Sequence, residues 1–134
     1  MEYVNAKMRD FLGIYGIQHT VKVKWLILNG NKYISDRSLI ITTTNETVPV
    51  FGFIKNIYVV NSSLYCFEYQ LYETVGWNRD LLAYEVAVPN LAQATEFIDA
   101  EKLVDHTSYY PVSFKNTTYV LTKYYLGDVA LLKQ

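Results

Sequence analysis

Few residues in this chain of 134 have side chains that could carry out chemistry. There are two histidines, His19 and His106, and a single cysteine, Cys66. Asp105 precedes His106 and forms the only adjacent pair of an acid and an imidazole. Because neighbouring residues in a chain seldom face the same point, this pair does not predict a catalytic triad. We interpret Asp105 and His106 as part of a solvated turn.

The chain also lacks the usual patterns for binding metals and phosphates. A structural zinc site needs four cysteine or histidine ligands in paired spacing, and the three candidates are scattered. No glycine-rich phosphate-binding motif occurs. Cys66 lies between two aromatic residues, where a thiol is usually a small buried side chain. We therefore predict a protein without catalytic residues, metal or cofactor. A carboxylate pair for glycoside hydrolysis stays open, although Glu68, Glu73 and Glu85 have no distinguishing spacing.

Aromatic residues are frequent, and packing in a β core explains most of them, while a ligand-binding cluster is the functional alternative. Thirteen Tyr, six Phe and two Trp make 16% of the chain, and several surround a predicted loop at residues 73–80. A tryptophan beside a glycine in a loop is costly to leave in water, so Trp77 either packs back on the domain or contacts a ligand. Aromatic walls with a nearby carboxylate can bind methylated ammonium groups. The candidate residues for binding a peptide or protein are Tyr72, Glu73, Trp77, Asn78, Arg79 and Asp80.

A second cluster combines basic residues with one tyrosine near the first predicted hairpin. Its members are Lys22, Lys24, Lys32, Tyr33 and Arg37. A solvated strand face explains them, and a shallow phosphate-binding patch with the tyrosine as stacking partner is the functional alternative. The net charge of -1 and the pI near 6.1 give no footprint for tight, sequence-independent nucleic-acid binding. We therefore favour a protein or peptide partner, with a nucleic-acid-binding accessory module as the alternative.

The elements that must position these residues are mostly strands. Residues 20–27 alternate with period two, which predicts one strand with Val21, Val23, Trp25 and Ile27 on a single face. The dipeptide Asn29-Gly30 then predicts a hairpin. Further strands are predicted at residues 38–44, 48–60, 64–74, 82–88, 96–98, 108–114 and 118–126.

Two helical segments complete the expected elements. Residues 2–12 have apolar side chains at helical spacing, and Asp99 is a candidate N-cap for a short turn of helix. Pro49 and Gly52 interrupt the long apolar strand and indicate a bend. Together these signals predict an all-β fold: a small, strongly bent antiparallel barrel or sandwich with a short N-terminal helix and one short late helical turn.

The length and composition predict one folded domain. Hydrophobic residues make 51% of the chain and charged residues 19%, which is enough apolar material for a core. We divide the chain into an N-terminal helix or extension at residues 1–18, a β-barrel-like domain at residues 19–126 and a tail at residues 127–134.

The expected compartment is reducing, either the nucleus or the cytoplasm. No apolar run reaches the roughly 18 residues of a membrane span, and the first residues are charged rather than a signal core. A single cysteine allows no internal disulfide. Against this stand three matches to the N-glycosylation pattern, at Asn45, Asn61 and Asn116, which support a secreted or viral surface domain as an alternative.

The order of elements also resembles a known kind of module. The segments that carry the resemblance are residues 50–57, 64–72, 83–86, 98–105 and 119–124. They are similar to the barrel-like module toward the C-terminus of transposon-derived animal proteins, and in outline to a bromo-adjacent homology (BAH) domain. The resemblance implies a chromatin or protein interaction module in a larger nuclear protein. It carries no functional residue over to this sequence.

Overall fold

The computed structural model describes residues 19–45, 48–90, 93–103 and 105–122, which form eleven strands and one short 3-10 helix. They are β1 (Thr20–Val23), β2 (Trp25–Leu28), β3 (Asn31–Ile34), β4 (Leu39–Asn45), β5 (Val48–Val60), β6 (Leu64–Asn78), β7 (Ala83–Ala87), β8 (Glu96–Asp99), η1 (Ala100–Lys102), β9 (Asp105–Tyr109), β10 (Pro111–Phe114) and β11 (Thr117–Leu121). The predicted all-β class is confirmed. The late helical turn is also present, and the Asp99 side chain accepts a hydrogen bond from the Glu101 N–H at 2.9 Å. The helix predicted at residues 2–12 and the tail at 127–134 lie outside the described residues.

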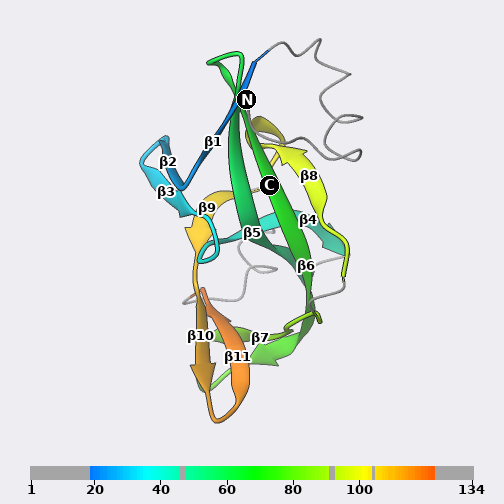
Figure 1. Cartoon of the computed structure of the whole chain (residues 1–134). Coiled ribbons are helices and arrows are strands. Elements are labelled where there is room, and N and C mark those ends of the chain that lie inside the picture. The colour runs from blue at the N-terminus through cyan, green and yellow to red at the C-terminus, as the bar shows by residue number, and fades with distance from the viewer. Residues whose placement is uncertain (1–18, 46–47, 91–92, 104, 123–134) are drawn as a thin grey trace.

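The two longest strands, β5 and β6, form a hairpin at the centre of the molecule (Figure 1). Its strands pair antiparallel from Phe51 and Tyr72 to Val60 and Leu64. Asn61 connects them in the left-handed region, a conformation that asparagine tolerates better than most residues. On its other edge β5 pairs with β4 and β1, and β6 pairs with β7 and β8. Each strand of the hairpin therefore pairs with two further strands on its outer edge.

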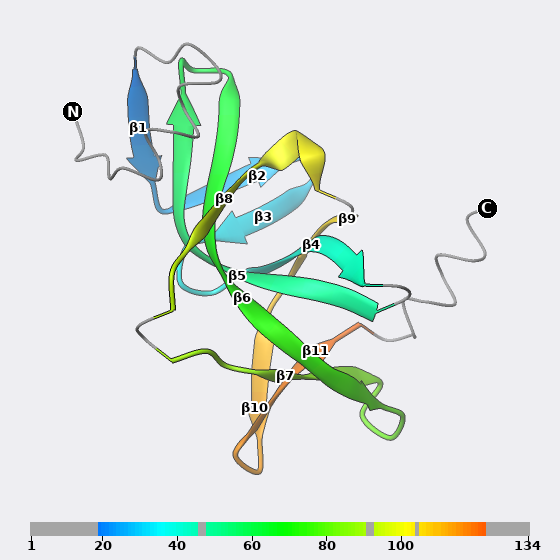
Figure 2. The same cartoon turned by 90° about the vertical axis from the view of Figure 1, so that its right-hand side faces the viewer.

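The main sheet is strongly curled, and its two edge strands, β9 and β10, follow each other directly in the sequence. Its strand order is β10-β11-β7-β6-β5-β4-β9, and only Tyr110 separates β9 from β10 in the sequence. Figure 2 shows β7, β10 and β11 gathered around the lower half of β6. Register shifts between Ile54 and Asn56 and between Thr74 and Gly76 add bulges, which increase the local twist. The structure confirms the bent antiparallel barrel-like sheet that the sequence predicts.

The described residues form three hydrophobic clusters, of which the smallest comprises Tyr58, Val60 and Cys66 near the β5–β6 turn. The two larger clusters, named here the first and second core, lie on opposite faces of the central strands. The first core comprises Tyr33, Ile40, Ile54, Ile57, Phe67, Ala100 and Leu103. The second core comprises Leu39, Ile41, Phe51, Tyr72, Tyr84, Val86 and Val120. Successive residues of β4 alternate between the two, since side chains along a strand point to opposite faces. Burial on both faces explains why β5 is apolar along most of its length and why β4 begins with the apolar run of residues 39–41.

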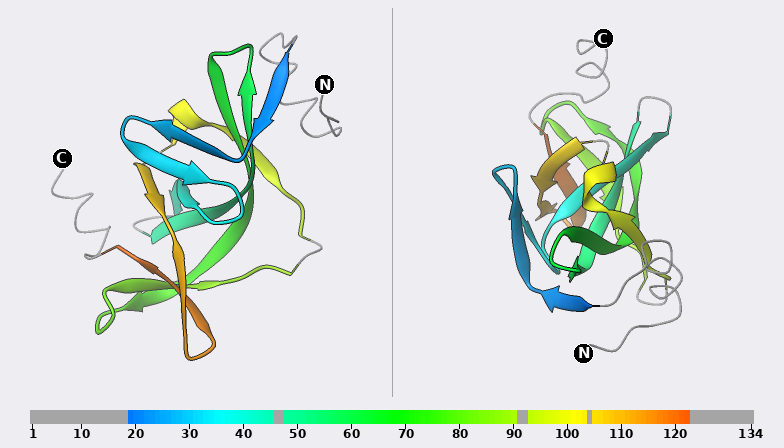
Figure 3. Two further views of the ribbon diagram at one scale, coloured as in Figure 1. Left: turned by 60° about the vertical axis from the view of Figure 1, so that its left-hand side comes forward. Right: turned by 90° about the horizontal axis from the view of Figure 1, so that it is seen from above.

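The strand predicted at residues 20–27 is wrong, because the structure contains two strands separated by a bend at Lys24. β1 pairs with β5, whereas β2 leaves that edge and pairs with β3 in a separate hairpin (Figure 3). Trp25 and Ile27 are therefore exposed, and Leu26 packs against the first core instead. The predicted turn at Asn29-Gly30 is confirmed, with both residues at positive φ.

The predicted loop at residues 73–80 is also wrong. β6 continues to Asn78 and pairs with β7, so only residues 79–82 connect the two strands. Gly76 does not end the strand because it has no positive φ and pairs with Glu85. Downstream, Asp105 and His106 lie in β9 rather than in a solvated turn, and β9 pairs with β4.

Gly52 has a different role from the bend that the sequence suggests. A Cβ atom at this position would lie 2.6 Å from Cδ2 of Tyr69 and 3.0 Å from Cγ2 of Thr42. Glycine is therefore required for the close approach of these side chains to the backbone of β5.

Candidate functional site

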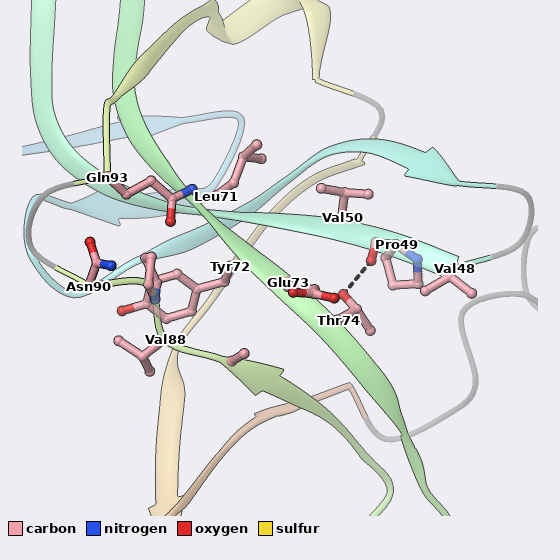
Figure 4. A pocket seen from close by; sticks show the side chains of 12 residues that line it. Val48, Pro49, Val50, Leu71, Tyr72, Glu73, Thr74, Val88, Asn90 and Gln93 are labelled. Atoms are coloured by element: carbon pink, nitrogen blue, oxygen red, sulfur yellow. Dashed lines mark hydrogen bonds between the residues drawn. The ribbon is translucent and has the colours of Figure 1, made fainter.

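The β5–β6 hairpin separates at the end opposite its turn. Its ladder stops at Phe51 and Tyr72; beyond them, residues 48–50 pair with β4 and residues 73–78 pair with β7. Thr74 Oγ1 donates a hydrogen bond of 2.6 Å to the backbone oxygen of Pro49, so that oxygen points toward β6. The N–H and C=O of one residue in a strand point to the same edge, and proline has no N–H. Pro49 therefore cannot continue the ladder, and the strands diverge (Figure 4).

We name the place where β5 and β6 diverge, beyond Phe51 and Tyr72, the fork. A pocket of about 600 Å³ lies there. It is lined by Val48, Pro49, Val50, Leu71, Tyr72, Glu73, Thr74, Ala87, Val88, Pro89, Asn90 and Gln93, most of which Figure 4 labels. No described strand pairs with residues 70–72 on the outer edge of β6, because β8 reaches only Tyr69 and β7 begins opposite Glu73. The pocket therefore borders a stretch of unpaired strand edge.

A second pocket of about 320 Å³ adjoins the first. Its lining comprises Asp36, Arg37, Phe53, Tyr72, Val88, Tyr110, Pro111, Ser113 and Thr118. Both pockets are lined by Tyr72 and Val88, so they meet at these two side chains. We name the two pockets together the Tyr72 groove. It is assembled from segments that lie far apart in the sequence.

The aromatic rings of the second pocket already have partners. Phe53 stacks on Tyr72 with ring centroids 5.3 Å apart and planes 15° apart. The Lys55 ammonium lies 5.5 Å from the Phe53 ring, and the Arg37 guanidinium lies 5.9 Å from the Tyr110 ring. Cations of the protein itself therefore contact the rings that a methylated ammonium ligand would use.

The structure brings together two of the six residues predicted for peptide binding. Tyr72 and Glu73 line the Tyr72 groove. Trp77 instead packs against the second core, edge-on to Tyr84 at 4.8 Å. The register shift between Thr74 and Gly76 inserts one extra residue in β6, and this places Trp77 on the face of the second core.

The remaining three predicted residues lie at the β6–β7 connection. Asn78 Oδ1 accepts a hydrogen bond of 3.0 Å from the Leu81 N–H and so caps the turn. Arg79 and Asp80 are exposed in this turn and line neither pocket of the groove. They do not share a site with Tyr72.

The basic cluster predicted for nucleic-acid binding is dispersed. Tyr33 is only 1% exposed and packs on Phe67 at 4.9 Å, and its hydroxyl donates to the backbone oxygen of His106. The prediction that Tyr33 stacks on a base is therefore wrong. Lys32 lies over the Trp25 ring at 5.0 Å, and Arg37 lines the second pocket.

The other two basic residues of that cluster lie near the start of the described chain. Lys22 is in β1 opposite Tyr58, and Lys24 is exposed at the bend after β1. The exposed aromatic residue of this region is Trp25, at 55%.

A buried polar cluster lies near the turn of the β5–β6 hairpin. The Glu68 carboxylate accepts hydrogen bonds from Asn56 Nδ2 (2.9 Å), Tyr58 Oη (3.2 Å) and Thr95 Oγ1 (2.6 Å). Burial, with smaller contributions from Asp99 and Glu68, raises the pKa of the adjacent Cys66 thiol to about 12. The thiol is therefore protonated at neutral pH and is a poor nucleophile. Glu68 is held by neutral donors rather than aimed into a cavity.

Two further properties concern only the described part of the chain. No group of three or more His, Cys, Asp or Glu residues is placed to hold a metal ion there. Among the same residues, no helix has the length and apolar character needed to cross a membrane.

Several groove residues give little signal in the sequence. Asp36, Phe53, Val88 and Tyr110 come from four separate segments, and their proximity depends on the curl of the sheet. The one usable signal is Pro49, since a proline inside a long apolar strand interrupts the ladder on the edge where its missing N–H would point, here the edge toward β6.

Comparison of the chain with protein-family models, with curated proteins and with solved structures gives no match. The chemistry of the Tyr72 groove therefore rests on its own residues and geometry.

Proposed function

We propose that this domain binds an extended segment of a protein partner in the Tyr72 groove and performs no catalysis there. The observation that carries the proposal is the meeting of two pockets, of about 600 and 320 Å³, at Tyr72 and Val88. A compact small molecule would fill one pocket, whereas an extended peptide contacts both. Strand edges and alternating side-chain pockets are a recurring way of recognising such segments.

The lining of the groove supports a peptide ligand. Val48, Val50, Leu71 and Val88 offer apolar contacts, and Val88 is 56% exposed although it is aliphatic. The unpaired edge of β6 at residues 70–72 can supply backbone hydrogen bonds to an added strand. Tyr72 adds a hydroxyl whose pKa is raised by burial, so it stays protonated at neutral pH and can donate.

The nuclear and chromatin parts of the hypothesis derive from the resemblance in the order of elements. They make histone-tail peptides, methylated and unmodified, the first defined ligands to examine. Because Arg37 and Lys55 already contact the ring faces of the second pocket, we expect no preference for the methylated forms.

A display selection of random peptides, followed by fluorescence anisotropy with the selected sequences, tests the proposal. Val88→Glu places a charge where the two pockets meet and should weaken binding at least tenfold, because an apolar contact is replaced by a carboxylate that must be desolvated. Val75→Glu is the matched control: Val75 is 59% exposed and lines neither pocket of the groove. We expect that variant to bind as the wild type does.

Failure to select any peptide, or equal weakening by the two variants, would overturn the proposal. Circular dichroism of both variants checks that the fold is retained, and the exposure of both valines makes a large loss of stability unexpected.

A further inference from the structure

One charged residue lines the larger pocket in the part of the chain that the structure describes. It is Glu73. The Glu73 side chain is exposed and forms no hydrogen bond or ion pair with any residue that the structure describes. An uncommitted carboxylate at the rim of a pocket favours a cationic group of a ligand.

The second pocket has the opposite charge. Among the described residues of its lining, Asp36 and Arg37 are charged. Asp36 forms an ion pair with Lys55 at 2.8 Å, which neutralises its charge. Arg37 contacts the Tyr110 ring and has no acidic partner among the described residues. The guanidinium, with its fork of donors, therefore favours a carboxylate or another anionic group.

The boundary between the two pockets is apolar. Tyr72 is stacked on Phe53 and is only 7% exposed, so most of the accessible apolar surface there belongs to Val88, which is 56% exposed. A ligand that contacts both pockets must cross these side chains. An apolar residue is the group that gains most from this contact.

From this arrangement we propose that the bound segment has a basic side chain at the Glu73 pocket, an apolar side chain over Tyr72 and Val88, and an acidic side chain at the Arg37 pocket. The inference rests on the proposed peptide-binding function and specifies its ligand. The apolar centre supplies most of the affinity, and the two charges set the direction in which the peptide lies. A uniformly anionic polymer such as a nucleic acid fits poorly, because Glu73 repels it.

The test uses fluorescein-labelled peptide libraries with a fixed central apolar residue. Their flanks are basic on both sides, acidic on both sides, or mixed. For the wild-type protein we expect selection of mixed flanks. In the best selected peptide, exchanging the two charged residues should weaken binding about tenfold, since two attractions of the size of exposed ion pairs become two repulsions.

Charge reversal of the protein should reverse this preference. Glu73→Lys should favour peptides with two acidic flanks, and Arg37→Glu should favour peptides with two basic flanks. The double variant Glu73→Lys/Arg37→Glu should bind the exchanged peptide as the wild type binds the original one. The matched controls are Glu101→Lys and Arg79→Glu, which change the net charge equally at exposed residues that line neither pocket.

The two proposals fail in different ways. Peptides that bind in a manner sensitive to Val88→Glu, but with no preference among flanks and no rescue by the double variant, would overturn the charge order and leave the groove as a peptide site. Equal effects of the control variants would overturn it too, because they would show that only net charge matters. Absence of binding sensitive to Val88→Glu would remove the proposed function itself.

Discussion

The two ends of the β5–β6 hairpin have different structures. At the turn end, residues 57–60 and 64–67 are paired with each other, and β1 and β8 cover their outer edges. At the fork end, the ladder stops at Phe51 and Tyr72, and a pocket of about 600 Å³ opens. One hairpin thus forms a closed sheet at one end and an open groove at the other, where its sequence includes Pro49, Glu73 and Thr74.

Buried and exposed acids illustrate the same difference. Glu68, near the turn end, accepts three hydrogen bonds from side chains. Glu73, only five residues further along β6, has no partner among the described residues. Buried polar groups in a paired sheet form hydrogen bonds with neighbouring residues. A carboxylate that can still bind a ligand is therefore found where strand pairing ends.

The largest expected difference between the two ends is in packing. Phe67→Ala at the turn end should lower the free energy of unfolding by about 3–5 kcal/mol, because Phe67 is fully buried in the first core. Leu71→Ala at the fork end should cost less than about 1 kcal/mol, because Leu71 is already partly exposed. Urea unfolding followed by tryptophan fluorescence measures both. Equal losses would show that the fork end is packed as tightly as the turn end.

A second prediction concerns alkaline pH at the turn end. Burial raises the pKa of Cys66 from its usual 9.0 to about 12. The unfolded chain releases this proton at lower pH than the folded chain does, so stability should fall as pH rises above about 9, by at most about 1.4 kcal/mol per pH unit. No change from this group is expected at neutral pH, where both states bind the proton.

The variant Cys66→Ala isolates the contribution of the thiol. Tyr33, whose pKa is also raised to about 12 by burial, contributes to both proteins and cancels in their difference. Urea midpoints of the wild type and the variant, compared at neutral pH and above pH 9, provide the measurement. A difference between them that does not change with pH would mean that the thiol is more accessible than its burial indicates.

Local signals in the sequence predict much of the turn end. Residues within a few positions of each other predict the turn at Asn61, the short strand β8 and the cap at Asp99. The same holds for the turn at Asn29-Gly30 in the separate β2–β3 hairpin. Such signals are reliable because the conformational preference and the structure involve the same residues.

The fork end could not be predicted in the same way. The extension of β6 through Gly76 depends on pairing with β7. Outside the fork, the exposure of Trp25 depends in the same way on a bend after which β2 pairs with β3. Arg37 and Tyr72 share a pocket only because the sheet curls. Pairing between strands that are distant in the sequence determines these features. The alternation of apolar residues does not predict them, because the same alternation fits burial of either face.

The smallest expected effect tests whether Pro49 causes the fork. Pro49→Val supplies an N–H on the edge that faces β6, where it can pair with the backbone of Thr74 and extend the ladder beyond Phe51 and Tyr72. We expect the amide at position 49 to be protected from hydrogen exchange, the stability to be kept or raised, and the affinity for a selected peptide to fall about fivefold as the pocket narrows. Thr74→Val is the control, since it removes the hydroxyl that contacts Pro49 without supplying the missing N–H. An unprotected amide would mean that the curl of β6 toward β7 separates the strands without help from Pro49. A protected amide with undiminished affinity would separate peptide binding from the fork, because the ladder would then be closed where the ligand is proposed to lie.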